Sequence, residues 1–261
     1  MSALQFLMGS FSQFLMVVLR LAGIFIVTPV FSNRVIPGPV KGILVLMVAL
    51  IAYPPLAAKG LVPDPGTVSE IIFFGVGEMF IGFLIGVLVL IVITIFQVSG
   101  QFYSIQMGFG IINVFDPLAE SSVPIISQLK TLLMTILFLL LDGHHLVFRA
   151  VFRSYKYLPT GMELEPSTML WEIVTQFDEM FQIAFLIGVP LIGVVFLMST
   201  TLGILTKIAP QMNVMIIGFG LKVMVGLSTF IFLLPEFIQV GVDLFRQHFR
   251  TLFDLFKTMG V

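Results

Sequence analysis

The chain has 261 residues, of which 58% are hydrophobic and only 10% are charged, and its formal net charge is −1. Soluble domains carry about 25% charged residues, so this composition excludes an ordinary soluble protein, and the near-neutral charge offers no basic surface for nucleic acid. The absence of cysteine excludes disulfides and thiolate metal sites. The composition therefore predicts an all-α integral membrane protein.

Apolar runs follow one another along the chain as candidates to cross a hydrocarbon core, which needs about 20 helical residues. They cover residues 11–30, 42–54 (extended to 58), 71–98, 124–147, 180–206 and 214–234. Prolines and glycines interrupt them, so we predict about six long, kinked helices arranged as helical hairpins. We expect no cleaved signal peptide, because the first basic residue, Arg20, lies inside the first run.

The connecting segments carry most of the charge. Residues 149–179 form the largest hydrophilic segment, which begins basic and turns acidic. The basic residues are divided almost evenly between the two sides of a simple six-span topology, so the orientation is poorly determined. After the sixth run, residues 236–257 are amphipathic. This pattern fits a helix at the membrane interface, an extension of the sixth helix, or a docking surface.

A polar, glycine-rich segment at 97–124 stands out because residues 79–115 contain no charged side chain. Irregular backbone at membrane depth persists only where protein or a wet cavity satisfies it. We therefore predict a re-entrant, plug-like loop between the third and fourth helices, with an apolar constriction that gates by dewetting. A structural loop with no conducting role would show the same pattern. The predicted plug and constriction comprise Gln106, Met107, Gly108, Phe109, Gly110, Ile111 and Phe115.

Four charged residues lie inside or at the rim of apolar runs: Arg20, Glu78, Asp142 and Lys222. A charge at the bilayer centre costs roughly 2.5 to 3.5 kcal/mol on insertion scales, so such groups face an interior and find partners. An ion or proton pathway is one interpretation. Two acids and two bases favour the other, which is pairing within the bundle or with another subunit.

The densest polar cluster is Asp142-Gly143-His144-His145, at the exit of the fourth run. A metal or proton site is conceivable, but on a regular helix only residues three or four apart share a face. Helix-end capping and packing fit that geometry better, and we predict no metal and no cofactor. The chain has no nucleophile-elbow, Walker or kinase motif. We therefore predict no enzyme; a membrane enzyme using Asp142 and His144 is the weakest alternative.

One sequence motif concerns the packing of helices. Gly82 and Gly86 form a small-xxx-small pattern in an apolar run, which is typical of two helices that approach closely.

Several segments, taken together and in order, carry a resemblance. They are GEMFIGFLIG (77–86), QVSGQFYSIQMGFGIINVFDP (97–117) and FLLLDGHHLVFRAVFRSYKYLP (138–159), supported by RLAGIFIVTPVFSNRVIPGPVK (20–41) and KIAPQMNVMIIGFGLKVMVGL (207–227). This set resembles the FliR family of flagellar export proteins and its type III secretion counterparts, over nearly the whole chain.

The resemblance implies a subunit of a protein export gate in the bacterial inner membrane, at the flagellar basal body. FliP and FliQ subunits would be its direct partners, FlhB and FlhA further ones, and unfolded flagellar proteins the cargo. It also implies a FliP-like part at about 1–175 and a FliQ-like helical hairpin at about 176–261. Neighbouring subunits would bury helices displaced toward the periplasmic side, and a plug loop would lie at about 105–122. A self-contained secondary transporter with a polar midplane site is the alternative.

Overall fold

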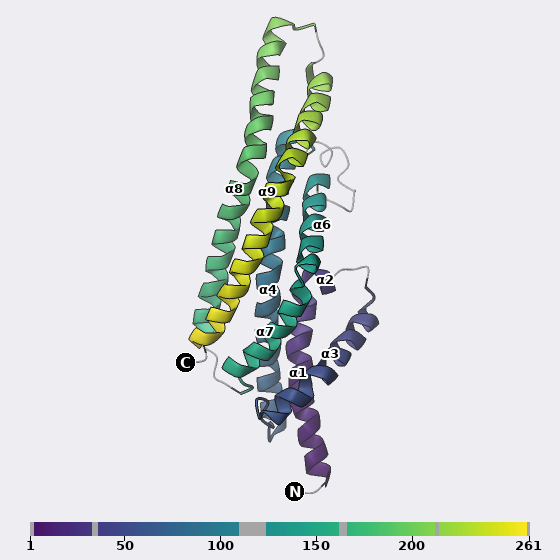
Figure 1. Ribbon diagram of the computed structural model, residues 1–261, viewed down its shortest axis with the longest axis vertical. Helices are drawn as coiled ribbons and strands as arrows, with labels where there is room; N and C mark the ends of the chain where they lie inside the picture. The colour runs from purple at the N-terminus through teal and green to yellow at the C-terminus, as the bar shows by residue number, and fades with distance from the viewer. Residues whose placement is uncertain (1–2, 33–35, 110–123, 162–165, 212–213, 260–261) are drawn as a thin grey trace. The chain divides into compact units, whose positions relative to one another are not determined.

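The computed structural model describes residues 3–32, 36–109, 124–161, 166–211 and 214–259, and every regular element in these ranges is a helix (Figure 1). The helices are α1 (Ala3–Val27), α2 (Pro29–Ser32), α3 (Gly38–Ala58), α4 (Val68–Met107), α6 (Ile125–Leu140), α7 (Gly143–Tyr157), α8 (Pro166–Ile208) and α9 (Val214–Met259). The all-α prediction is confirmed for this part of the chain.

Four helices of the described chain are long and apolar enough to cross a membrane: α3, α4, the Trp171–Ile208 part of α8, and the Ile217–Thr258 part of α9. Helices α6 and α7, which are bent at the break between them, would make a fifth span if they act as one. The apolar part of α1, Phe11–Val27, is shorter than these. The described residues therefore support four or five spans by length and composition, rather than six.

Three of these helices are much longer than the predicted runs. Helix α4 has 40 residues, α8 has 43 and α9 has 46. At about 1.5 Å per residue each measures roughly 60 to 70 Å, about twice the thickness of a hydrocarbon core. Only part of each helix can lie in lipid, so the rest needs water, protein, or both around it.

The fourth apolar run is not one helix, contrary to prediction. Helix α6 ends at Leu140 and α7 begins at Gly143. Between them Asp142 adopts the left-handed conformation, with φ 55°. Asp is among the few non-glycine residues that tolerate this region. A Cβ on Gly143 would lie 2.3 Å from the ring of Phe138, so the chain passes closely there only because this residue is glycine.

The described chain forms two compact units. Unit 1 comprises Met1–Ile91, Phe138–Val174 and Phe245–Val261, and unit 2 comprises Val92–Leu137 and Thr175–Leu244. Several helices pass from one unit into the other, and each unit has its own buried residues.

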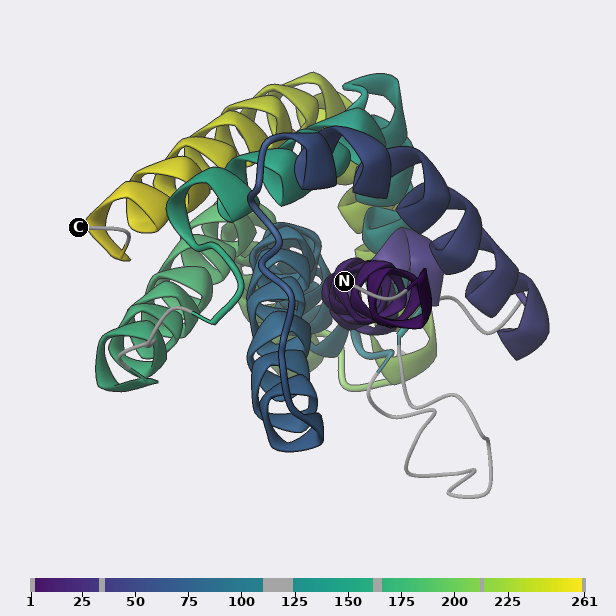
Figure 2. The ribbon, with the colours of Figure 1, turned by 90° about the horizontal axis from the view of Figure 1, so that it is seen from below.

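In unit 1, α1 lies directly against α4 (Figures 1 and 2). The contact is made by glycines: a Cβ on Gly82 would lie 1.9 Å from the backbone oxygen of Arg20, and one on Gly23 would lie 2.3 Å from that of Met79. One turn after Gly82, a Cβ on Gly86 would lie 3.0 Å from Cβ of Val27. The predicted small-xxx-small packing motif is thus confirmed, and its partner is α1.

In unit 2, glycines again bring helices together. A Cβ on Gly100 of α4 would lie 2.7 Å from Cα of Ser127 on α6, and the Ser127 hydroxyl donates a 2.9 Å hydrogen bond to the backbone oxygen of Gln97. Helices α8 and α9 form a long antiparallel hairpin (Figure 1), where a Cβ on Gly218 would lie 3.0 Å from the Leu202 side chain. The first part of the polar segment, from Gln97 to Met107, is regular helix and belongs to α4. The predicted irregular backbone does not begin at Gln97.

The amphipathic tail and the sixth run form one continuous helix, α9. Of the three predicted alternatives, this is the extension of the sixth helix. In unit 1 its apolar face is buried: Phe245 packs on Phe138 with ring centroids 5.5 Å apart. Arg153 of α7 lies over the ring of Phe253, at 4.1 Å from its centroid. The charged residues Asp243, Arg246, Arg250, Asp254 and Lys257 are exposed.

Candidate functional site

The first feature is a buried ion pair between α1 and α4. The side chains of Arg20 and Glu78 are 0% and 1% exposed, and the guanidinium group donates two hydrogen bonds to the two carboxylate oxygens, one through Nε and one through Nη2. The guanidinium group makes two further hydrogen bonds. Nη1 donates to Ser154 Oγ at 2.8 Å, and Nη2 also donates to the backbone oxygen of Leu158 at 3.0 Å.

The Glu78 carboxylate is held by α7 and the segment after it. Tyr155 donates to Oε2 at 3.0 Å, and Thr160 donates to Oε1 at 2.6 Å. The Arg20 guanidinium carbon lies 3.5 Å from the centroid of the Tyr155 ring, a cation–π contact. A buried charge pair is tolerated when hydrogen bonds satisfy its remaining atoms. This arrangement meets that condition and ties α1, α4 and α7 together.

The other two predicted charges are not part of this network. Asp142 is 74% exposed, and its Oδ1 lies 3.2 Å from Nδ1 of His145. Its side chain makes no capping hydrogen bond at the start of α7, so the predicted capping role is wrong. Lys222, on α9, is half-buried, and no hydrogen bond or ion pair of it is found among the described residues.

A second buried cation, Lys130 on α6, was not among the predicted site residues. It is 2% exposed and donates a 2.8 Å hydrogen bond to Ser99 Oγ on α4. The rings of Phe237 and Phe230 on α9 lie 4.7 Å and 6.0 Å from its ammonium group. The sequence contained a signal: Lys130 lies six residues beyond Pro124 and so already inside the apolar run.

The third feature is the end of α4, where the predicted plug begins. Gly108 has φ +97°, its N–H donates to the oxygen of Ile105, and the N–H of Phe109 donates to the oxygen of Ser104. This pair of bonds is the Schellman pattern, in which a left-handed glycine closes a helix. The local sequence Met107-Gly108-Phe109 thus ends the helix at a defined residue.

This helix end is packed on α9 within unit 2. Met107 is fully buried, and a Cβ on Gly226 would lie 2.7 Å from its terminal methyl group. Phe109 and Phe219 are in edge-to-face contact, with ring centroids 6.0 Å apart. Gln106 is half-buried. The other predicted plug residues, Gly110, Ile111 and Phe115, lie outside the described residues.

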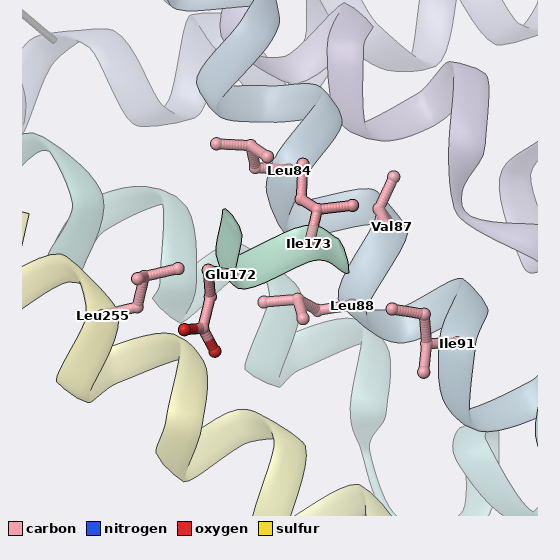
Figure 3. Close-up of a pocket in the computed structure, with 7 residues that line it drawn as sticks. All are labelled: Leu84, Val87, Leu88, Ile91, Glu172, Ile173 and Leu255. Atoms are coloured by element: carbon pink, nitrogen blue, oxygen red, sulfur yellow. The ribbon is translucent and has the colours of Figure 1, made fainter. Parts of the chain in front are cut away.

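Unit 1 also contains a pocket (Figure 3). Its lining is apolar apart from one carboxylate, and it comprises Leu84, Val87, Leu88, Ile91, Glu172, Ile173 and Leu255. Glu172 is the one lining residue with a charged group (Figure 3). Apolar walls with a single acid offer no base–nucleophile pair of the kind that acyl-transfer chemistry uses.

Long apolar helices together with a fully buried, hydrogen-bonded ion pair define a helical membrane protein. Comparison with known proteins gives the family. Residues 11–248 match bacterial export proteins, family 1, and the chain belongs to that family, as the resemblance to FliR predicted.

The relatives agree with this assignment. The flagellar biosynthetic protein FliR of Bacillus subtilis (strain 168) is 26% identical over 254 residues, covering 96% of this chain and 97% of the relative. FliR of Escherichia coli (strain K12) is 25% identical over 241 residues, covering 92% and 91%. FliR of Borreliella burgdorferi is 32% identical over 155 residues, covering 58% and 57%.

Proposed function

We propose that the chain is a non-enzymatic subunit of the flagellar protein export channel, through which unfolded flagellar proteins cross the bacterial inner membrane. The observation that carries this proposal is the family match over residues 11–248. The alignments with two relatives named flagellar biosynthetic protein FliR cover nearly the whole length of those relatives. FliP and FliQ subunits are the proposed direct partners, with FlhB and FlhA beside them. Since the sequence has no nucleotide-binding motif, the energy for export would come from those partners.

Large exposed apolar side chains support an assembly. On α3, Leu50 and Ile51 are 62% and 75% exposed, and on α9 Phe232 is 82% exposed. Helices of roughly 60 to 70 Å cannot be covered by lipid along their whole length. Neighbouring subunits in the basal body would cover the remainder, which fits helices displaced toward the periplasmic side.

We keep the proposed division into a FliP-like part (about 1–175) and a FliQ-like hairpin (about 176–261) as part of this proposal. It does not follow the two compact units, because each unit contains residues of both parts. In the second part, α8 and α9 form the long hairpin described above.

The end of α4 is the proposed start of the channel plug. Met107 and Phe109 are anchored on α9, and Gly108 provides the turn after which the chain leaves the helix. We propose that Gln106 to Ile111, together with Phe115, obstruct the closed channel and withdraw when cargo passes. Anchoring on α9 would hold this seal in place while the gate is closed.

Copurification tests the assembly. We expect the chain, extracted from its native host in mild detergent through a C-terminal tag, to carry distinct small membrane subunits with it in fixed ratio. Replacing exposed Phe232 by glutamate should release them without unfolding the chain, because a charge in an apolar contact is strongly unfavourable. The matched control is Gln247→Glu, on the exposed charged face of α9. A chain that purifies alone and remains stable would contradict the proposal and favour a transporter.

The transporter alternative finds no support among the described residues of the polar segment. It depended on an interrupted polar segment as a midplane site. The described part of that segment, from Gln97 to Met107, is continuous helix.

Ion leakage tests the plug. We expect deletion of residues 107–111 to make the assembled channel conduct ions in the absence of cargo, measured as membrane depolarisation in cells. A milder variant, Met107→Ala with Phe109→Ala, removes the anchors on α9 and should leak less than the deletion. Its control is Met224→Ala with Phe196→Ala, the same residue types at exposed positions of α9 and α8. Unchanged conductance in both plug variants, with the complex still assembled, would reject the plug.

A further inference from the structure

The break between α6 and α7 exposes a carboxylate that does not cap the helix after it. Asp142 is the N-cap residue of α7, where an aspartate side chain ordinarily accepts a hydrogen bond from the first turn. Its left-handed backbone turns the side chain away from that role, and no capping bond forms. The carboxylate is 74% exposed.

Two histidines follow immediately and converge with this carboxylate. Asp142 Oδ1 and His145 Nδ1 are 3.2 Å apart, and the rings of His144 and His145 have centroids 4.1 Å apart. One ligand atom from each of the three residues lies within 4.8 Å of the other two. Two ligands on one tetrahedral zinc ion, each about 2.0 to 2.1 Å from the metal, are roughly 3.4 Å apart. Small side-chain rotations would therefore bring all three into one coordination sphere.

The ring nitrogens and an entry path are both available. Nδ1 of His144 is buried and has no hydrogen-bond partner among the described residues. A buried polar atom left in this state is rare and calls for a partner. The side chains of His145 and Asp142 are both exposed, so an ion could reach them from solvent. Adjacent side chains on a regular helix ordinarily diverge, yet these two rings in the first turn of α7 lie close together, with centroids 4.1 Å apart.

We propose that Asp142, His144 and His145 form a binding site for a divalent transition-metal ion of the zinc class. Imidazole and carboxylate ligands suit such ions, and three protein ligands leave a fourth position for water or for a ligand from another subunit. The bound ion would tie Asp142 to the first turn of α7 and hold the chain in its left-handed conformation. This proposal differs from the sequence-based expectation of no metal, and it is independent of the proposed export function.

Direct titration tests the site. The full chain, purified in detergent through a tag without histidine, is titrated with Zn²⁺ against a chromogenic chelator, and separately with Co²⁺ and Mg²⁺. We expect one Zn²⁺ per chain, the visible absorption bands of tetrahedral Co²⁺, and no comparable Mg²⁺ binding, because Mg²⁺ prefers an all-oxygen octahedral site. His145→Ala and Asp142→Asn should each weaken Zn²⁺ binding at least about tenfold, since even groups that only support a metal ligand change affinity by roughly 10- to 100-fold.

The variants are chosen so that misfolding does not confuse the result. Asn tolerates the left-handed conformation as Asp does, so Asp142→Asn should keep the helix break. Circular dichroism spectra should match those of the unaltered chain. The control is Asp254→Asn, an exposed aspartate elsewhere in unit 1 that should leave Zn²⁺ affinity unchanged. The proposal is overturned by the absence of saturable Zn²⁺ binding to the unaltered chain, or by equal affinity in Asp142→Asn, His145→Ala and the control.

Discussion

Replacing Glu78 by glutamine is expected to lower the free energy of unfolding by about 3 to 5 kcal/mol, the cost of removing one partner from a buried ion pair. The guanidinium group of Arg20 would stay enclosed by α1, α4 and α7 with no anion beside it. Tyr155 and Thr160 donate to different carboxylate oxygens, and glutamine keeps only one oxygen, so one hydroxyl group would face the amide NH2 group instead. The loss should appear as a large fall in Tm, which is measured by circular dichroism in detergent. The amount of the protein in cells should fall as well.

Two further variants separate charge from general damage. Glu179→Gln makes the same chemical change at an exposed position of α8 and should leave Tm nearly unchanged. The double variant Arg20→Met with Glu78→Leu removes both charges and should recover part of the loss, because well-packed apolar side chains often replace a buried pair at little cost. A Glu78→Gln chain as stable as the Glu179→Gln chain would show that the pair contributes little.

How far the sequence predicts this structure depends on whether the responsible interaction is local. The charge-free runs and the Gly82/Gly86 spacing predict helices and a close helix contact, because composition and period are properties of a single segment. The choice of α1 as the partner helix could not be predicted, since it depends on contacts between segments 58 residues apart, as in the bond between Arg20 and Glu78.

The errors at the polar segment have the same origin. Gln97, Ser99 and Gly100 suggested irregular backbone, yet they lie within the last third of α4. Buried Ser99 accepts a hydrogen bond from Lys130 of α6. Gly100 allows Ser127 of the same helix to approach α4 closely. These residues serve helix packing in unit 2, which a single-segment pattern does not reveal.

At Asp142 the prediction failed for a different reason. The apolar character continues across 124–147, so hydropathy alone predicts one helix. The break depends on a left-handed backbone and on the space that Gly143 leaves for Phe138. Asp-Gly is a turn signal, and it marked this position despite the apolar residues on either side.

A single methyl group at Gly82 should also be strongly destabilising. In Gly82→Ala the new Cβ would lie 1.9 Å from the backbone oxygen of Arg20 and 2.9 Å from its carbonyl carbon. Backbone atoms cannot rotate away as a flexible side chain can, so α1 must move. Overpacking of this kind costs roughly 1 to 3 kcal/mol, sometimes more. Here the displaced residue is itself a member of the buried ion pair, so we expect the upper part of that range, measured as a fall in Tm.

The control reverses the sign of the effect. Gly193→Ala makes the same change inside α8, at a glycine whose Cβ would meet nothing within 4 Å. There alanine should stabilise the helix by about 0.5 to 1 kcal/mol, because glycine is the poorer helix former. If α1 acts on stability through Arg20, then Gly82→Ala combined with Glu78→Gln should cost less than the sum of the two single changes, since both disrupt the same contact. Strict additivity, or a Gly82→Ala chain as stable as Gly193→Ala, would show that α1 accommodates the methyl group without disturbing the ion pair.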